Sequence, residues 1–402
     1  MKIRSIDIVP IIISFSAIFV CLKLTIGGQI VTEVLALKVF CRGILLIFVI
    51  YHIINISHRK NRFHVNKPVA LFTFFNLFVF TGLVYSVDKS NTFVSLIEYL
   101  TSSLAGYYLG RNYSGRCDIL FRSVLYMVIL VSGFLFYYFL SSPSDVFVSM
   151  NGSLETSDFF GLGGSIIHVH SLAMLLLILF VCTLWSENKY STKLVLSIFC
   201  VVITIATLSR TGFIILPLII AFWIVSYKKP AKINLAIIIF ITISALFVVP
   251  ILAEKILSIF IRGAPISDLL SGSNRLYIFK SGIDEFTKSP LLGFGFDNFS
   301  FLGNYLVVDQ SYERSSLHNQ YLYILVSTGV IGFVLFLLFL GSLIIASTKK
   351  NEKYNIRNFA FYIILIIFSL TQDTIFNDST PLQFCTFIIL GTTMTRHFKN
   401  YG

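Results

Sequence analysis

Long apolar runs recur along this 402-residue chain, and most of them approach the length needed to cross a lipid bilayer. Hydrophobic residues make up 56% of the sequence, whereas charged residues make up only 12%. A soluble globular domain carries about 25% charged residues, so this chain has too little polar surface to be soluble. We therefore predict a polytopic integral membrane protein of the all-α class.

Windows of about 20 apolar residues predict twelve transmembrane helices. They cover residues 6–25, 34–56, 68–86, 92–109, 119–140, 166–185, 193–209, 211–227, 233–252, 321–346, 358–371 and 380–395. The segment 193–227 is divided because a single helix there would be about 50 Å long, which exceeds a hydrocarbon core of about 30 Å. The predicted hinge is Ser209-Arg210-Thr211-Gly212.

The distribution of basic residues supports this division. With the N-terminus in the cytoplasm, most Lys and Arg residues fall in cytoplasmic segments, while the outer loops 141–165 and 372–379 contain acidic residues and no Lys or Arg. An undivided span would place KKPAK and STKKNEKYNIR outside. The net charge of +12 therefore indicates topology, with both termini cytoplasmic, and not nucleic-acid binding. The first apolar run lacks a small-residue cleavage site, so we expect it to be retained.

The cysteines give no sign of a metal centre. The six cysteines lie in or near apolar runs, and none forms a CxxC or another metal-ligand spacing. We interpret them as small hydrophobic residues of the membrane helices. The sequence predicts neither a metal nor a cofactor.

The predicted topology divides the chain into three parts. Residues 1–252 hold helices one to nine, residues 253–320 form a large outer loop, and residues 321–402 hold the last three helices and a cytoplasmic tail. The large loop is rich in residues of both charges, and long translocated loops do not follow the charge rule. Its basic residues therefore suggest a partly anionic partner outside the cytoplasm.

One segment of this loop, RLYIFKSGIDEFTKSP, predicts an amphipathic helix. Its apolar stripe would consist of Leu276, Phe279, Ile283 and Phe286. Arg275 would lie in the first turn, where the helix dipole disfavours a cation. Either an anion bound at this turn or a salt bridge to Asp297 or Asp268 explains it. The following GFGFDNF stretch predicts a turn that allows close backbone packing, not a nucleotide-binding loop.

Four further polar residues are predicted on the same side of the membrane as the large outer loop. Arg210 lies between two short spans, below the headgroup level, where an arginine is costly and usually paired or functional. The alternative to a functional role is that Arg210 snorkels to the membrane surface from a helix C-terminus. His318 lies in the first turn of the tenth span, at the outer surface, where the dipole favours a neutral imidazole. It could act as a general base, or serve only as an interfacial polar cap. His168 and His170 open the sixth span on this side, for substrate contact or for capping.

Two arginines and a neutral histidine suit a diphosphate-linked lipid substrate. Arginine binds phosphate oxygens bidentately and stabilises the charge on a departing diphosphate. The histidine would deprotonate an attacking hydroxyl. The activated phosphate ester would supply the energy, so ATP is not required.

Three stretches, LSRTG, NRLYIFKSGIDEF…SPLLGFGFDNF and HNQYLYILVSTGVIGF, resemble the bacterial O-antigen ligase and O-antigen polymerase superfamily. The resemblance covers about residues 205 to 335. His318 is followed by Asn319, nine residues and then Gly329-Val-Ile-Gly332, a pattern similar to that of ligases.

The resemblance implies a metal-independent glycosyltransferase of the bacterial inner membrane that uses undecaprenyl-diphosphate-linked polysaccharide at the periplasmic face. Arg210 and Arg275 would bind the diphosphate, His318 would be catalytic, and Asn319 and Lys280 are further candidates for substrate contact. In a ligase the acceptor is lipid A–core, in lipopolysaccharide biosynthesis. In a polymerase, the alternative, it is another lipid-linked repeat unit. A lipid-oligosaccharide transporter is the alternative from another class.

Overall fold

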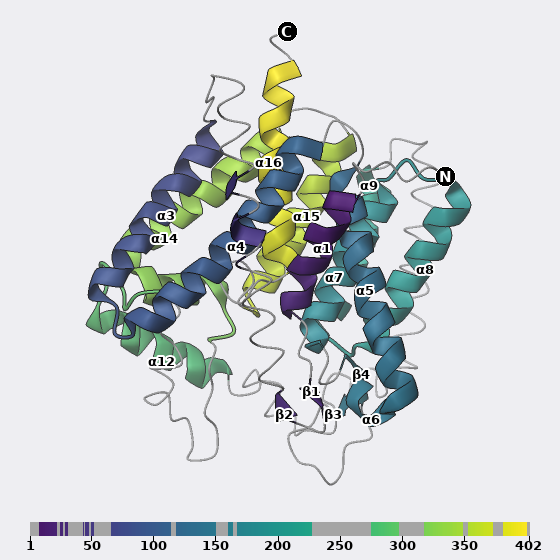
Figure 1. The fold of residues 1–402 in the computed structure, drawn as a ribbon, viewed down its shortest axis with the longest axis horizontal. Coiled ribbons are helices and arrows are strands. Elements are labelled where there is room, and N and C mark those ends of the chain that lie inside the picture. Colours follow the sequence, from purple (N-terminus) through teal and green to yellow (C-terminus); the bar gives the residue numbers. More distant parts are fainter. Residues whose placement is uncertain are drawn as a thin grey trace. The chain divides into compact units, whose positions relative to one another are not determined.

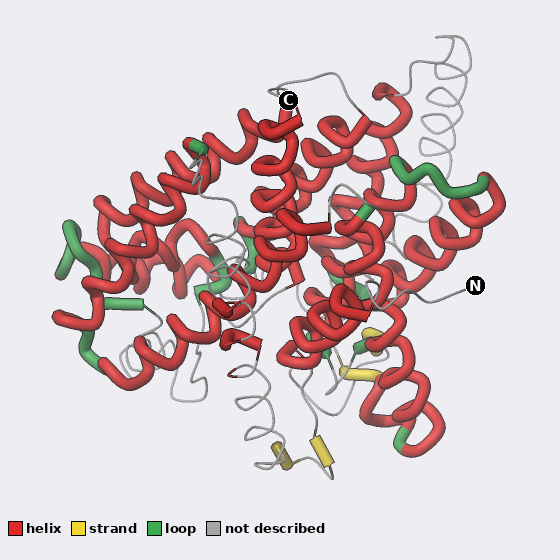
Figure 2. Tube along the Cα trace, turned by 45° about the horizontal axis from the view of Figure 1, so that its top comes forward, coloured by secondary structure: helices red, strands yellow, loops and turns green. Residues whose placement is uncertain are grey.

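The computed structural model describes residues 8–21, 25–26, 29–30, 43, 45–47, 50–51, 66–113, 118–149, 160–163, 167–226, 275–296, 317–348, 353–372 and 381–399. Most of this part of the chain is helical, as Figure 2 shows. It divides into two compact units, one made of residues 1–132 and 277–402 and the other of residues 133–276. The chain passes from the first unit to the second within helix α5 (Ile119–Ser141).

The first unit contains the N-terminal and C-terminal helices. Its elements are α1 (Ile8–Cys21), the strands β1 (Thr25–Ile26) and β2 (Gln29–Ile30), α3 (Lys67–Tyr85), α4 (Lys89–Tyr113), the start of α5, most of α12 (Arg275–Lys288), α14 (Gln320–Thr348), α15 (Lys353–Ser369) and α16 (Pro381–Lys399). Figure 1 shows α3 and α14 side by side, with α12 across their ends.

The second unit is a smaller helical group. After the end of α5 come α6 (Pro143–Val146), the antiparallel strands β3 (Phe147–Ser149) and β4 (Phe160–Leu162), then α7 (Val169–Leu184), α8 (Tyr190–Ala206) and α9 (Arg210–Ser226). Helix α7 packs against both α8 and α9 and is buried along most of its length. The two short ribbons, β1–β2 and β3–β4, are additions to the predicted all-helical fold.

Apart from α6 and α12, the described helices lie at predicted spans, and the protein is a mostly helical membrane protein. Within the described ranges, α3, α5 and residues 320–346 of α14 are long and apolar enough to cross a membrane. Shorter apolar helices are α7, α8, α9, Ile356–Ser369 and Pro381–Thr393. Helix α4 is not among them, because it carries Lys89, Glu98 and Arg111 together with several hydroxyl groups. The predicted span 233–252 and most of the predicted span 34–56 lie outside the described residues, so the total of twelve stays a prediction.

Glycines allow α4 and α16 to pack with their backbones close together. A Cβ atom at Gly110 would lie 3.0 Å from the Cα of Gly391, and one at Gly106 would lie 3.1 Å from the Cβ of Phe387. Small residues at such spacing are the usual means by which membrane helices approach each other. The amide of Gln383 adds hydrogen bonds to the Tyr99 carbonyl (3.0 Å) and the Ser103 hydroxyl (3.2 Å). This contact fixes α16 in the interior of the first unit.

An aromatic cluster joins α3 and α14. The ring centroids of Phe72 and Phe339 are 5.4 Å apart, and those of Phe72 and Phe387 are 4.8 Å apart. Phe75 and Phe336 continue the contact along the two helices at 6.2 Å. Tilted aromatic pairs at these distances are favourable beyond the area they bury. The cluster holds α14 against the rest of the unit, and His318 lies two residues before the start of this helix.

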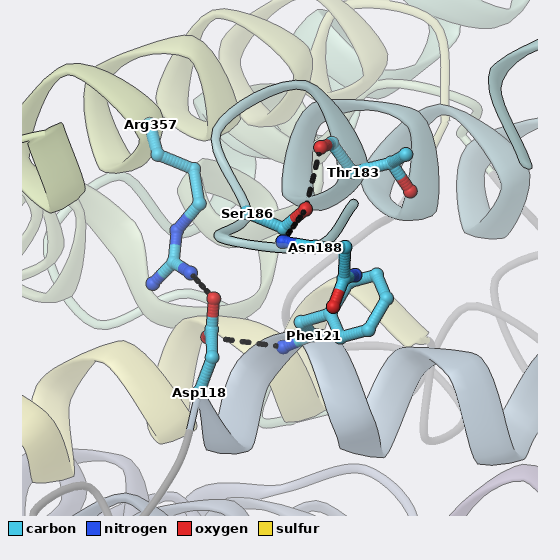
Figure 3. Close-up of polar contacts among 6 residues, drawn as sticks. All are labelled: Asp118, Phe121, Thr183, Ser186, Asn188 and Arg357. Carbon is cyan, nitrogen blue, oxygen red and sulfur yellow. Dashed lines mark hydrogen bonds and ion pairs between the residues drawn. The ribbon is translucent and has the colours of Figure 1, made fainter. Parts of the chain in front are cut away.

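A salt bridge ties α15 to the start of α5. Figure 3 shows the Arg357 guanidinium against the Asp118 carboxylate, whose other oxygen accepts the Phe121 backbone N–H at 3.3 Å. Asp118 thus closes the first turn of α5 as a capping residue. In the second unit, the Ser186 hydroxyl donates to the Thr183 carbonyl at 2.9 Å and so closes the end of α7 (Figure 3).

Candidate active site

The predicted break within residues 193–227 is present. Helix α8 ends at Ala206 and α9 begins at Arg210, and the three-residue turn between them contains Leu208 with φ 51°. A bulky residue with a positive φ is strained. The turn is stabilised by the Ser209 hydroxyl, which accepts the Gly212 backbone N–H at 3.3 Å, and by the Ser209 carbonyl, which accepts that of Phe213 at 3.0 Å. Ser209 therefore caps α9.

Arg210 is the first residue of α9 and is half-buried. This position corrects the alternative in which Arg210 would snorkel from a helix C-terminus. A cation at a helix N-terminus is opposed by the helix dipole, so the dipole does not explain its placement. An anion beside Arg210 would offset this unfavourable placement.

His170 contacts this turn from helix α7. Its Nδ1 atom lies 2.8 Å from the Ser209 Oγ, and its ring centroid lies 5.1 Å from that of His168. His168 is the N-cap of α7, and its side chain accepts the His170 backbone N–H at 3.4 Å. The sequence left both histidines undecided, since no local pattern connects residue 170 with residue 209.

Helix α12 forms where the sequence predicts it, from Arg275 to Lys288. In the predicted apolar stripe, Phe279 and Phe286 are half-buried and Ile283 is 52% exposed, so the stripe is not the face that packs most closely against the protein. The buried face consists of Ile278, Gly282 and Glu285. Gly282 explains the difference: a Cβ there would lie 2.8 Å from Leu322 and 3.0 Å from Leu317, so the helix approaches these leucines along its glycine.

Two basic site residues, Lys280 and Arg275, are predicted on α12, and the structure describes the side chain of Lys280 alone. Lys280 is exposed on the outer face of the helix. The side chain of Arg275 lies outside the described part of the chain, and its role stays a prediction. Its backbone opens α12, as Arg210 opens α9.

The turn after α12 inserts into a break in α14. Gly329 has φ 64° and ψ −170°, which interrupts the helix and frees backbone groups on both sides. Phe294 and Gly295 donate their N–H groups to the carbonyls of Val326 (3.1 Å) and Ser327 (3.0 Å). The Val330 N–H in turn donates to the Pro290 carbonyl at 2.9 Å. Gly329 therefore has a structural role in the pattern that follows His318, because the break that it makes in α14 accepts this turn.

Helices α3 and α4 hold the other side of the turn. The Tyr85 hydroxyl donates to the Leu292 carbonyl at 2.9 Å, and the Thr92 hydroxyl donates to the Phe296 carbonyl at 2.7 Å. Gly293 and Gly295 have positive φ angles of 72° and 94°. This is the closely packed turn that the GFGFDNF stretch predicts.

His318 lies two residues before α14 and is half-buried. The prediction that it lies in the first turn of the helix is wrong, because Asn319 caps the helix. The Asn319 Oδ1 accepts the backbone N–H groups of Tyr321 (3.0 Å) and Leu322 (3.1 Å), and its Nδ2 donates to the Leu370 carbonyl at 3.4 Å. His318 itself has φ 49°, a left-handed conformation.

The first unit thus holds His318, Asn319 and Lys280, and the second holds Arg210 with its contact to His170. Leu208 and His318 are the non-glycine residues with positive φ among those described. Leu208 lies two positions before Arg210, and His318 is itself a predicted site residue. Among the described residues, no group of three or more His, Cys, Asp or Glu side chains could hold a metal ion.

These features define a helical membrane protein. Its candidate polar residues lie at or just before the starts of helices, and two positions there, Leu208 and His318, have strained backbones. The family model of O-antigen ligase matches residues 194–337, which include α9, α12, Arg210 and His318. The match confirms the predicted resemblance to the ligase and polymerase superfamily over this part of the chain. A match to this family supports a glycosyltransferase-type activity in the O-antigen pathway, with lipid-linked glycans as the general class of substrate. No curated protein matches the chain.

Proposed function

We propose that the protein is an O-antigen ligase that transfers polysaccharide from undecaprenyl diphosphate to a lipid A–core acceptor. The reaction takes place at the periplasmic face of the bacterial inner membrane, as a step of lipopolysaccharide biosynthesis. The family match supports the reaction class, and the residues within it support the chemistry. The spacing of His318, Asn319 and the Gly329-Val-Ile-Gly332 motif favours the ligase over the polymerase.

The strained backbone at His318 is the observation that carries this proposal. A left-handed conformation costs a non-glycine residue about 1–3 kcal/mol, and it persists only where the surroundings enforce it. Glycine would fit the φ of 49° without strain, so the presence of histidine requires another reason. A side chain that the reaction needs is such a reason.

The reaction begins with proton transfer from the acceptor hydroxyl to the His318 imidazole. The acceptor oxygen attacks the anomeric carbon of the donor sugar, and the bond between that carbon and the diphosphate oxygen breaks. Undecaprenyl diphosphate leaves with the electron pair and an additional negative charge. Arg210 and Arg275 stabilise this charge through bidentate hydrogen bonds to phosphate oxygens. His318 then returns its proton to the medium or to the leaving group.

The surroundings of His318 suit a fixed general base. Asn319 anchors the start of α14, and the turn at residues 289–296 is bonded into the break at Gly329. Catalytic groups work best when their supporting shell is rigid. Exposed Lys280 on α12 is available for the glycan or a phosphate, whereas Asn319 contributes chiefly by holding His318 in place.

The contacts within the first unit agree with the proposed topology. Tyr85 bonds to Leu292 and Asn319 to Leu370, and these pairs join chain segments predicted at the outer face. Asp118 and Arg357, by contrast, join two segments predicted to be cytoplasmic. This agreement supports a periplasmic loop at residues 253–320, with the membrane helices in residues 1–252 and 321–402.

A lipopolysaccharide gel of a strain lacking this gene tests the proposal. We expect bare core on the gel and long polymer accumulating on the lipid carrier, and restoration of the ladder by the wild-type gene. Core that bears a single repeat unit would instead indicate the polymerase. A normal ladder in the strain without the gene would contradict both reactions.

A further inference from the structure

The contact between His170 and Ser209 joins two segments that are 39 positions apart. His170 lies in the first turn of α7, and Ser209 lies in the turn between α8 and α9. Ser209 is fully buried, so its hydroxyl depends on partners within the protein. A buried hydroxyl without a hydrogen-bonding partner is unfavourable, which gives the 2.8 Å contact with the His170 Nδ1 a clear stabilising role.

Ser209 is the last residue of the turn before Arg210 and makes several of the contacts that hold this turn. Its backbone N–H donates to the Thr207 hydroxyl at 3.3 Å, its hydroxyl caps α9 at Gly212, and its neighbour Leu208 has a φ of 51°. Each of these contacts constrains the backbone immediately before Arg210. A change at Ser209 therefore alters the position from which the Arg210 side chain extends.

We propose that His170 is a positioning residue for Arg210. Its Nδ1 atom holds the Ser209 hydroxyl, which fixes the strained turn and the start of α9, and thereby places the guanidinium that binds the donor diphosphate. The role of Arg210 in this inference rests on the proposed function. His170 itself does not touch the donor.

The hydrogen bond is made by one specific atom of the ring, and this makes the inference testable. The side chain of asparagine places an amide atom near the position of Nδ1, whereas the longer glutamine side chain places one near Nε2. If His170 acts through Ser209, His170→Asn keeps the affinity for the donor and His170→Gln weakens it. A histidine that contacts the donor through Nε2 would give the opposite order.

The experiment uses the full-length protein in lipid nanodiscs with the lipid-linked donor at varied concentration. Loss of one hydrogen bond corresponds to a factor of about two to ten. We expect His170→Gln to raise the KM for the donor by such a factor with a smaller change in kcat, and His170→Asn to stay close to the wild type. His168→Asn is the matched control, since asparagine preserves an N-cap. It should leave the KM unchanged.

A double-mutant cycle with Ser209→Ala tests the route of the effect. If His170 acts only through Ser209, the double variant with His170→Gln has the KM of the more severe single variant. Independent, multiplying effects would overturn the proposal, as would wild-type kinetics for His170→Gln. Thermal unfolding of each variant shows whether the protein is folded.

Binding of undecaprenyl diphosphate, without any acceptor, separates this inference from the proposed function. Weaker binding by His170→Gln but not by His170→Asn supports the positioning role, even if no glycan is transferred and the ligase proposal fails. Transfer by the wild type, with identical binding by both variants, would refute the positioning role alone. A wild-type protein that does not bind this lipid would refute it too.

Discussion

The Arg357 side chain is only 6% exposed, and it meets the Asp118 carboxylate within the first unit. Removing one partner of such a pair leaves the other charge poorly compensated in a low-dielectric environment. We predict that Asp118→Ala lowers the free energy of unfolding by about 3 kcal/mol. The measurement is denaturant unfolding in mixed micelles.

The pair formed by Lys288 and Glu285 provides the control for this prediction. Lys288 is 59% exposed, and an exposed ion pair contributes about 0–1 kcal/mol. Lys288→Ala should therefore change the free energy of unfolding by less than about 1 kcal/mol. Equal effects of Asp118→Ala and Lys288→Ala would show that the pair with Arg357 is not energetically important.

Individual residues could be predicted from the sequence where their chemistry opposed their position. Arg210 and His318 stood out because charged or polar side chains at the ends of apolar spans are costly. The contact of His170 with Ser209 could not be predicted, because it joins distant segments and leaves no periodic or local signal. The strain at Leu208 was also invisible, since leucine gives no indication of a positive φ, and a single histidine gives only a weak one.

At the scale of elements, the break in α14 is the feature with the strongest mutational consequence. Gly329 adopts a conformation that only glycine accepts readily, and a Cβ there would collide with the backbone of Leu291. We predict that Gly329→Ala lowers the free energy of unfolding by more than about 2 kcal/mol and displaces the turn at residues 289–296.

Gly341 of the same helix is the matched control. A Cβ at this position would meet no atom within 4 Å, and alanine is favoured over glycine in a helix by about 0.5–1 kcal/mol. Gly341→Ala should leave the protein as stable as the wild type or slightly more stable. Equal destabilisation by both variants in the same unfolding experiment would mean that the Gly329 break has no special role.

The helices themselves could largely be predicted from the lengths and composition of the apolar runs. The division of 193–227 followed from bilayer thickness, and the structure has α8 and α9 there. The buried face of α12 could not be predicted from hydrophobicity. The helix packs closely at Gly282, so the face with this glycine is buried more deeply than the face with the largest apolar side chains. The β1–β2 and β3–β4 ribbons were also missed, since strands of two or three residues are too short to show an alternating pattern.

For the whole molecule, the orientation in the membrane follows from the charge distribution and can be measured directly. We predict that Lys288→Cys faces the periplasm and Glu187→Cys faces the cytoplasm, each in a variant without the native cysteines. Both positions are exposed. A membrane-impermeant maleimide should label Lys288→Cys in intact spheroplasts, and Glu187→Cys only after permeabilisation. Labelling in the reverse order would contradict the topology and with it the periplasmic site.

We propose that the His318 side chain deprotonates the acceptor hydroxyl and that its strained backbone is retained for this purpose. The most direct test compares the lipopolysaccharide ladders of strains producing the wild type, His318→Ala and His318→Gly at equal abundance. Glycine accepts the φ of 49° without strain, so His318→Gly should fold at least as well as the wild type. We predict bare core for both variants. A full ladder from His318→Gly would show that the position needs only a left-handed backbone, and it would contradict a catalytic histidine.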